Sequence, residues 1–123
     1  MYENRSKTRA RETVRIFIEE SCSAHERGEV SDAWNLLAKA HVVSQPFALS
    51  HTLVHWRMLS LALRTRNLSE IKGQIFRLLV AAPGSLLKKY PKGNPGTSDV
   101  NAFQPMLISA DVQAIIDRIE IMK

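Results

Sequence analysis

The stretch AHVVSQPFALSHTLVHWRM, residues 40–58, decides the fold because it contains the turn between two predicted helices. Pro46 ends the first of these helices, since the residue before a proline is disfavoured in the helical conformation. Apolar residues recur at helical spacing on both sides of the turn. The stretch also holds three of the four histidines, His41, His51 and His55. We therefore expect an all-α fold with a cluster of histidines close to this turn.

Outward from the turn, apolar spacing and helix-ending residues predict about five helices. Gly28 ends the first helix, because glycine favours the left-handed conformation of a C-terminal cap. Ser31 and Ser69 are expected to cap the helices that follow them, and Pro83-Gly84 is expected to break the fourth. The predicted helices span residues 8–27, 31–45, 50–65, 69–82 and 109–122.

The apolar positions of each predicted helix define the face that we expect to be buried. Cys22, Trp34 and Trp56 are also expected to lie in the core or in a groove. The predicted inward faces are Val14, Phe17, Ile18 and Ala24 in the first helix, Ile71, Ile75, Leu78, Leu79 and Ala82 in the fourth, and Val112, Ile115, Ile116 and Ile119 in the last.

A weak internal sequence repeat with a period of 38 residues relates the first two predicted helices to the next two. The segment that begins at Gly28 aligns with the one that begins at Arg66, and each follows one helix and opens another. The small, large, small spacing in the second helix resembles that of a tetratricopeptide repeat. We expect two antiparallel helical hairpins with tetratricopeptide-like packing, followed by a long loop and a C-terminal helix.

The chain is expected to form one domain over residues 1–123, with residues 1–7 frayed. Residues 84–108 are expected to form an irregular loop, because glycines and prolines crowd the segment from Pro91 to Pro105. A loop of this length in a compact domain is usually functional when it is ordered. We expect it to pack on the domain through Tyr90, Phe103 and Met106.

Composition limits the class of protein. No run of about 18 apolar residues could span a bilayer, and no apolar signal segment opens the chain. One cysteine cannot form an internal disulfide, so we expect a cytoplasmic protein with no membrane association. The net charge of +5 is unevenly distributed along the sequence. Residues 57–92 contain eight basic residues and only one acidic residue, Glu70. Nucleic-acid binding is disfavoured because no recognised reading motif accompanies these charges.

The histidine cluster has two interpretations. His51 and His55 are four residues apart on one helix, the spacing that zinc sites use, and His41 can add a third nitrogen from the preceding helix. Such a site would suit a transition metal such as zinc, copper or nickel. Metalloprotease chemistry is disfavoured, since HTLVH contains no glutamate. The alternative is three neutral core histidines that bond to backbone carbonyls, to Ser44, Gln45 or Ser50, or to one another.

Three functions remain compatible with the sequence. The first is a small non-enzymatic binding or adaptor module for a protein or peptide, with a homodimer as one form. The second is a transition-metal-binding accessory protein of metal stress, and the third is a small enzyme with a histidine base. All three would use a polar pocket between the second helix, the third helix and the long loop. The candidate pocket residues are His41, Gln45, His51, His55, Gln74, Asn94 and Asn101, and no catalytic residue is assigned.

Several phrases occur in an order that resembles a small bacterial family catalogued as domain of unknown function 3703. They are the run from Ala33 through AHVVSQP, then HTLVHWRML, GQIFRLL from Gly73 and PKGNPGTSDVNAFQPM, followed by the closing helix after Ser109. Together they cover about Gly28 to Ile119. The resemblance implies no established activity and therefore no catalytic residues. Because members of the family often lie near heavy-metal-resistance genes, it implies a metal-linked role for the three histidines.

Overall fold

A computed structural model of the chain describes residues 2–121, which form five helices joined by short turns and one long loop. The helices are α1 (Tyr2–Glu26), α2 (Val30–Ser44), α3 (Ala48–Arg64), α4 (Leu68–Leu86) and α5 (Ala110–Ile121). The described residues contain no strand, so the predicted all-α class is confirmed. None of their helices is long and apolar enough to cross a membrane.

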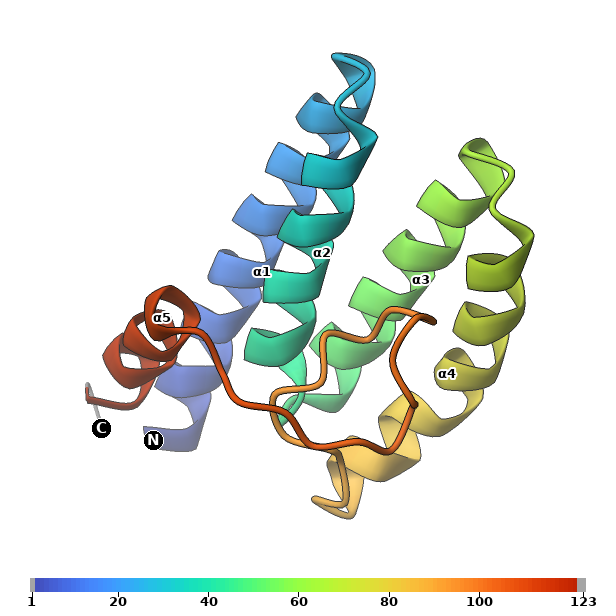
Figure 1. Cartoon of the computed structure of the whole chain (residues 1–123). Coiled ribbons are helices and arrows are strands. Elements are labelled where there is room, and N and C mark those ends of the chain that lie inside the picture. The colour runs from blue at the N-terminus through green and yellow to red at the C-terminus, as the bar shows by residue number, and fades with distance from the viewer. Residues whose placement is uncertain (1, 122–123) are drawn as a thin grey trace.

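The helices form two antiparallel hairpins, as predicted (Figure 1). Helix α1 packs on α2, and α3 packs on α4, while α2 contacts α3 and joins the two hairpins. Helix α5 contacts α1 and α2, so it extends the first hairpin (Figure 1). The tetratricopeptide likeness of this packing stays a prediction.

The two hairpin turns have the same hydrogen bonds, which explains the repeat in the sequence. Gly28 (φ 80°) and Arg66 (φ 54°) both adopt the left-handed conformation, 38 residues apart. The N–H groups of Gly28 and Glu29 each donate back to the last turn of α1 at 2.9 Å. Those of Arg66 and Asn67 make the same bonds to α3, at 3.3 and 2.9 Å. This pattern is the Schellman cap, and it ends each first helix at the equivalent position.

Some predicted boundaries differ from the structure. Helix α1 begins at Tyr2, so residues 2–7, which we expected to fray, are helical. The side chain of Asn67, and not Ser69, caps α4 by accepting from the N–H of Glu70 at 3.2 Å. Helix α2 begins at Val30, one residue before the serine expected to cap it. Met1 and the predicted last residue of the final helix, Met122, lie outside the described residues.

An apolar core fills the first hairpin and its contacts with α3 and α5. It includes Val14, Ile18, Leu37, Val54, Met58, Val112 and Ile119, each at most 7% exposed. The predicted inward faces of the first and last helices are therefore confirmed in their main residues. Cys22 and Trp56 do not join this core, because each follows a buried residue and is turned by about 100° to the exposed side of its helix. Trp34 is partly buried against the core.

Helix α4 is rotated by about 100° about its axis from our expectation. Of the five apolar residues predicted to face inward, Ile75 and Leu79 are 50% and 74% exposed, and Ile71, Leu78 and Ala82 are only partly buried. The buried residues of α4 are Glu70, Gln74, Arg77, Ala81 and Ser85. They recur at helical spacing, so α4 turns a continuous, mainly polar stripe toward the interior.

Pro83 and Gly84 do not end α4, which continues to Leu86. Leu79 and Pro83 lie on the exposed face of the helix. Water can therefore bond the carbonyl that the proline leaves without a helical partner. The helix ends at Leu86, and a third Schellman cap forms after it, with Lys88 (φ 55°) in the left-handed conformation.

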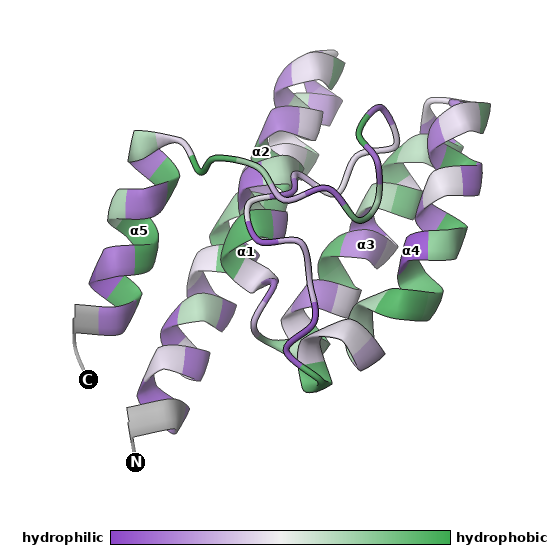
Figure 2. Cartoon of the chain, turned by 60° about the horizontal axis from the view of Figure 1, so that its bottom comes forward, coloured by the Kyte–Doolittle hydropathy of each residue, from purple (hydrophilic) through white to green (hydrophobic). Residues whose placement is uncertain are grey.

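The irregular segment between α4 and α5 runs across the ends of the helices at the junction of the two hairpins (Figures 1 and 2). We call residues 87–109 the crossing loop. It packs on the domain, and of the three side chains predicted to hold it, Phe103 packs edge-on against Phe76 of α4 with 6.0 Å between the ring centroids. Phe103 is 66% and Met106 43% exposed, and Tyr90 is partly buried. The polar stripe of α4 and Gln45 add hydrogen bonds to the loop, and these bonds lie around the histidines.

Candidate metal centre

Three buried imidazole rings converge where α2, α3, α4 and the crossing loop meet. His41 comes from the last turn of α2, and His51 and His55 come from successive turns of α3. Each is at most 5% exposed. The Nε2 atom of His41 lies 2.9 Å from that of His51 and 2.9 Å from that of His55. The Nε2 atoms of His51 and His55 lie 3.2 Å apart. The histidines predicted to cluster therefore meet through one nitrogen each.

The other nitrogen of each ring, Nδ1, faces an oxygen atom. Nδ1 of His41 lies 2.6 Å from the backbone carbonyl of Asn94 in the crossing loop. Nδ1 of His51 lies 2.8 Å from Oγ of Ser85, and Nδ1 of His55 lies 2.7 Å from Oε1 of Gln74. Both of these partners belong to the polar stripe of α4. The stripe and the loop thus fix the orientation of all three rings.

The bonds of the partners determine where the ring hydrogens lie. The carbonyl of Asn94 can only accept, so Nδ1 of His41 donates. The amide nitrogen of Gln74 donates to the carbonyl of Gly96 at 2.8 Å, which leaves its Oε1 to accept from His55. The hydroxyl of Ser85 donates its one hydrogen to the carbonyl of Gln45 at 2.6 Å. Its oxygen therefore accepts from His51, and all three Nδ1 atoms carry hydrogen.

A neutral imidazole carries only one N–H, so the three converging Nε2 atoms each present a lone pair. With every ring hydrogen at Nδ1, the contacts of 2.9–3.2 Å between these nitrogens have no donor. Three lone pairs at this separation repel one another. The arrangement becomes favourable only when a positive charge lies among the nitrogens.

A proton is a poor candidate for that charge because the surroundings disfavour protonated histidine. Burial, together with the neighbouring His55, lowers the pKa of His51 to about 3. Burial also lowers the pKa of His55 to about 4, with a contribution from Arg77 and opposition from the bond to Gln74. The pKa of His41 is well below its usual value, through burial and then the two other rings. At neutral pH the cluster is uncharged, and the lone pairs of its three Nε2 atoms are free of protons.

The crossing loop is built around Asn94, which is 1% exposed. Its side-chain nitrogen donates to the carbonyls of Asn101 and Gln104 at 2.9 Å each, and its side-chain oxygen accepts from Gly96. Its backbone carbonyl is thereby held in place to accept from His41. The loop conformation thus orients one of the three rings directly.

Gly96 allows the loop to lie against the histidine cluster. Its φ of 83° is in the left-handed region, and a Cβ there would lie 2.5 Å from Cδ2 of His41. Real Cβ atoms do not approach other atoms so closely. Any other residue at this position would push the loop away from the ring, so this position requires glycine.

The predicted pocket residues divide into three groups. Gln74 contacts a histidine with its side chain, and Asn94 contacts one with its backbone. Gln45 touches none of the rings but fixes the loop, since its amide donates to Pro91 and accepts from Gly93. The side chain of Asn101 is turned away from the rings and accepts from the N–H of Phe103, while its backbone carbonyl accepts from the side chain of Asn94. A polar residue in a loop gives no periodicity from which its direction could be predicted.

The sequence analysis missed Ser85, Glu70 and Arg77. The expected serine partners of the histidines were Ser44 and Ser50, but Ser85 makes the bond to His51. The signal that could have found these residues is their spacing with Gln74 on one face of α4. The apolar residues of α4 lie about 100° around the helix from this stripe, and an apolar face is the one that is ordinarily buried.

No acidic residue or cysteine joins the three histidines as a further ligand among residues 2–121. Glu70 is separated from His55 by the amide of Gln74, which donates to it at 3.1 Å. Ser85 and His51 are close enough to be a nucleophile and its base. However, the serine hydrogen already goes to Gln45, so His51 acts as the donor in this pair. The arrangement is suited to holding an ion and not to activating the serine.

Comparison with known proteins places the chain in a family. A family model described as "Protein of unknown function (DUF3703)" matches residues 8–116. The chain belongs to the DUF3703 family. The match includes all three histidines and their partners on α4 and the crossing loop. No curated protein and no solved structure matches the chain.

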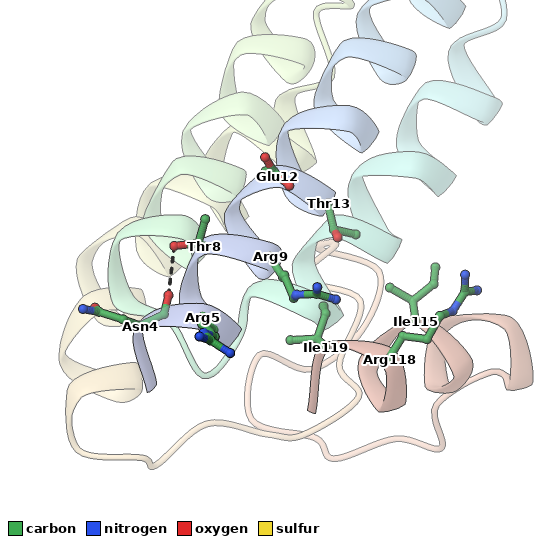
Figure 3. A pocket seen from close by; sticks show the side chains of 9 residues that line it. All are labelled: Asn4, Arg5, Thr8, Arg9, Glu12, Thr13, Ile115, Arg118 and Ile119. Carbon is green, nitrogen blue, oxygen red and sulfur yellow. Dashed lines mark hydrogen bonds between the residues drawn. The ribbon is translucent and has the colours of Figure 1, made fainter. Parts of the chain in front are cut away.

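A second hollow in this DUF3703 member lies between α1 and α5 (Figure 3). Its volume is about 1030 Å³, and Arg5, Arg9 and Arg118 are among the residues that line it. Figure 3 shows these arginines spread along the cleft and not gathered around one point. Arg5 and Arg118 are exposed, so water already solvates them. This cleft lacks the convergent, buried geometry of the histidine cluster.

Proposed function

We propose that this protein binds a transition-metal ion through the Nε2 atoms of His41, His51 and His55. The observation that carries the proposal is the convergence of three ring nitrogens that hold no hydrogen. Histidines that bind metals almost always donate their other N–H to an oxygen, which fixes the tautomer and the ring orientation. Here Asn94, Gln74 and Ser85 accept those bonds.

The spacing of the nitrogens supports a single ion. Nitrogens about 2.0–2.1 Å from one ion lie about 2.8–3.0 Å apart at right angles and about 3.3–3.4 Å apart at the tetrahedral angle. The observed separations of 2.9, 2.9 and 3.2 Å fall within that range. An ion would lie to one side of the plane of the three nitrogens and keep further positions free for other ligands.

The ligand set favours certain ions. Three imidazoles suit zinc, copper, nickel and cobalt, whereas magnesium and calcium prefer oxygen ligands. Cys22 is exposed and unpaired with any thiol in the chain, so a reducing cytoplasm is the compartment that fits best. We therefore place the protein in the cytoplasm as a metal-binding accessory protein.

Calorimetric titration of the metal-free protein with Zn²⁺, Cu²⁺ and Ni²⁺ tests the proposal. We expect one ion per chain, and loss of that binding in His51→Asn, whose amide can replace Nδ1–H but not Nε2. The matched control is His25→Ala, which removes the one histidine that lies outside the cluster. Binding that survives in His51→Asn, or that disappears in His25→Ala, would contradict the proposed site.

We infer a second candidate function, a binding module for a protein or peptide, from the outer face of α4. Leu68, Ile75, Leu79 and Leu86 are 50–74% exposed on this helix. Their spacing is that of helix anchors that bind apolar partners. A homodimer is the simplest form of this function. Sedimentation at increasing concentration is expected to show self-association that Leu79→Glu removes, and a wild type that stays monomeric throughout would contradict the dimer.

A further inference from the structure

A cavity of about 280 Å³ lies against all three histidines. The polar stripe of α4 and the crossing loop close around it, and Arg77 is the one cationic side chain of the stripe. The volume is just below the usual range for ligand pockets, about 300–1,000 Å³. Much of the remaining wall is apolar and consists of Leu79, Val80, Ala81, Pro83, Leu87 and Phe103. The cavity therefore has a polar end at the imidazoles and an apolar body.

The charges around the cavity are not balanced for a metal ion. The three ring nitrogens are neutral ligands, and no carboxylate or thiolate of residues 2–121 lies among them. Glu70 is already engaged, because one oxygen accepts from the N–H of Ser98 at 2.9 Å and the other from Gln74. A dication bound here would carry its full charge into a buried site, which is costly without a counter-charge.

Arg77 adds to the positive field. It is 7% exposed and donates to the carbonyls of Thr97 and Val100 at 3.2 and 2.7 Å, so it is fixed beside the cavity. These acceptors are neutral, and the carboxylates of Glu70 and Asp99 offset only part of its charge through space. An anion in the cavity would be attracted both by the ion and by this guanidinium.

We propose that the bound ion keeps an open coordination position toward the cavity and that a small carboxylate with an apolar body occupies it. The proposal rests on the metal site proposed above. The carboxylate would supply the missing negative charge, and its body would contact the apolar wall formed by α4 and Phe103. A three-nitrogen site with one exchangeable position is the arrangement of zinc sites that bind an external ligand.

The test uses the full-length chain loaded with Co²⁺, whose visible absorption reports changes in its ligands. Acetate, benzoate and neutral benzamide are then titrated in turn. We expect saturable spectral changes with both carboxylates, about tenfold tighter for benzoate because its ring enters the apolar part. Benzamide is expected to produce no change at the same concentrations.

Phe103→Ala provides the matched variant. Phe103 is 66% exposed, so its truncation is not expected to affect folding. We expect unchanged Co²⁺ binding and acetate affinity, with benzoate affinity reduced about threefold to tenfold. Cobalt binding without any spectral response to carboxylates would overturn the open position and leave the metal site standing. Failure to bind Co²⁺, Zn²⁺, Cu²⁺ or Ni²⁺ at all would overturn the metal site itself.

Discussion

The two hairpins of this protein bury opposite kinds of surface. Between α1 and α2 the interior is apolar, with Leu37 and Val14 almost fully buried. Between α3, α4 and the crossing loop it is polar, and Gln74 is 0% and Asn94 1% exposed. The first hairpin is thus built to stabilise the fold, and the second is built to hold a site.

The difference has a thermodynamic consequence. Apolar burial stabilises the first hairpin at any pH and without a ligand. The second hairpin depends on the protonation state of three histidines and on the hydrogen bonds that orient them. The stability of the second hairpin is therefore expected to respond to pH and to metal ions, and that of the first is not.

Acid is expected to destabilise the protein through the histidine cluster. The unfolded chain takes up protons on its histidines from about pH 6.5, whereas His51 and His55 in the fold remain neutral to about pH 3 and 4. Each such histidine makes stability fall by about 1.4 kcal/mol per pH unit as pH decreases in this window. The two together predict a loss of roughly 5 kcal/mol between pH 6.5 and 4.5.

Urea unfolding of the metal-free protein at several pH values measures this loss. His51→Asn is expected to reduce the slope by about 1.4 kcal/mol per pH unit, since it removes one proton taken up on unfolding. Leu79→Ala, on the exposed face of α4, should keep the wild-type slope. A wild type with constant stability from pH 6.5 to 4.5 would show that the cluster is not buried in its neutral form.

The apolar hairpin is tested by a pair of leucines. Leu37→Ala leaves a cavity in the core and is expected to reduce the free energy of unfolding by about 2–5 kcal/mol. Leu79→Ala is the matched change on α4 and is expected to alter it by about 0.5 kcal/mol or less, because Leu79 is 74% exposed. Denaturant unfolding at neutral pH measures both. Equal losses would contradict the orientation of α4.

Zinc is expected to stabilise the protein only through the polar hairpin. At a free zinc concentration 100 times the dissociation constant, linkage predicts a gain of about 2.7 kcal/mol. Leu37→Ala should keep this gain, and His51→Asn should lose it. Amide hydrogen exchange is expected to slow in the crossing loop, since the carbonyl of Asn94 holds one of the ligands. If zinc slowed amide hydrogen exchange equally in the turn of the first hairpin, its effect would not be confined to the polar hairpin.

The contrast between the apolar and the polar hairpin also explains which parts of the structure could be predicted from the sequence. The helices of the apolar hairpin follow from ordinary apolar spacing, and their inward faces are confirmed. The histidine cluster is also predictable in part, because His51 and His55 share a helix face and the turn at Pro46 brings His41 near them. Local spacing and a short turn are sufficient for both.

The rest of the site was not predictable because it breaks the usual rule of burial. Periodicity shows that Glu70, Gln74 and Ser85 share one face of α4, but it does not show which face lies inside. The apolar face of a helix is normally buried, and here the polar face is buried because the histidines and the crossing loop bond to it. Such long-range partners, including the carbonyl of Asn94, leave no local trace in the sequence.

Gln74→Leu tests whether the polar stripe of α4 supports metal binding as well as folding stability. Leucine is close in size to glutamine but leaves Nδ1–H of His55 and the carbonyl of Gly96 without their partners. We expect a stability loss of about 1–3 kcal/mol from these buried groups. Metal affinity should fall by about 10- to 100-fold, because the ring of His55 is no longer held in its orientation and tautomer. Calorimetry with Zn²⁺ and urea unfolding of the same preparation measure the two effects together. A variant that loses stability but binds zinc as tightly as the wild type would mean that the polar stripe supports only the fold. The two hairpins would then differ in the kind of residues that they bury and not in function.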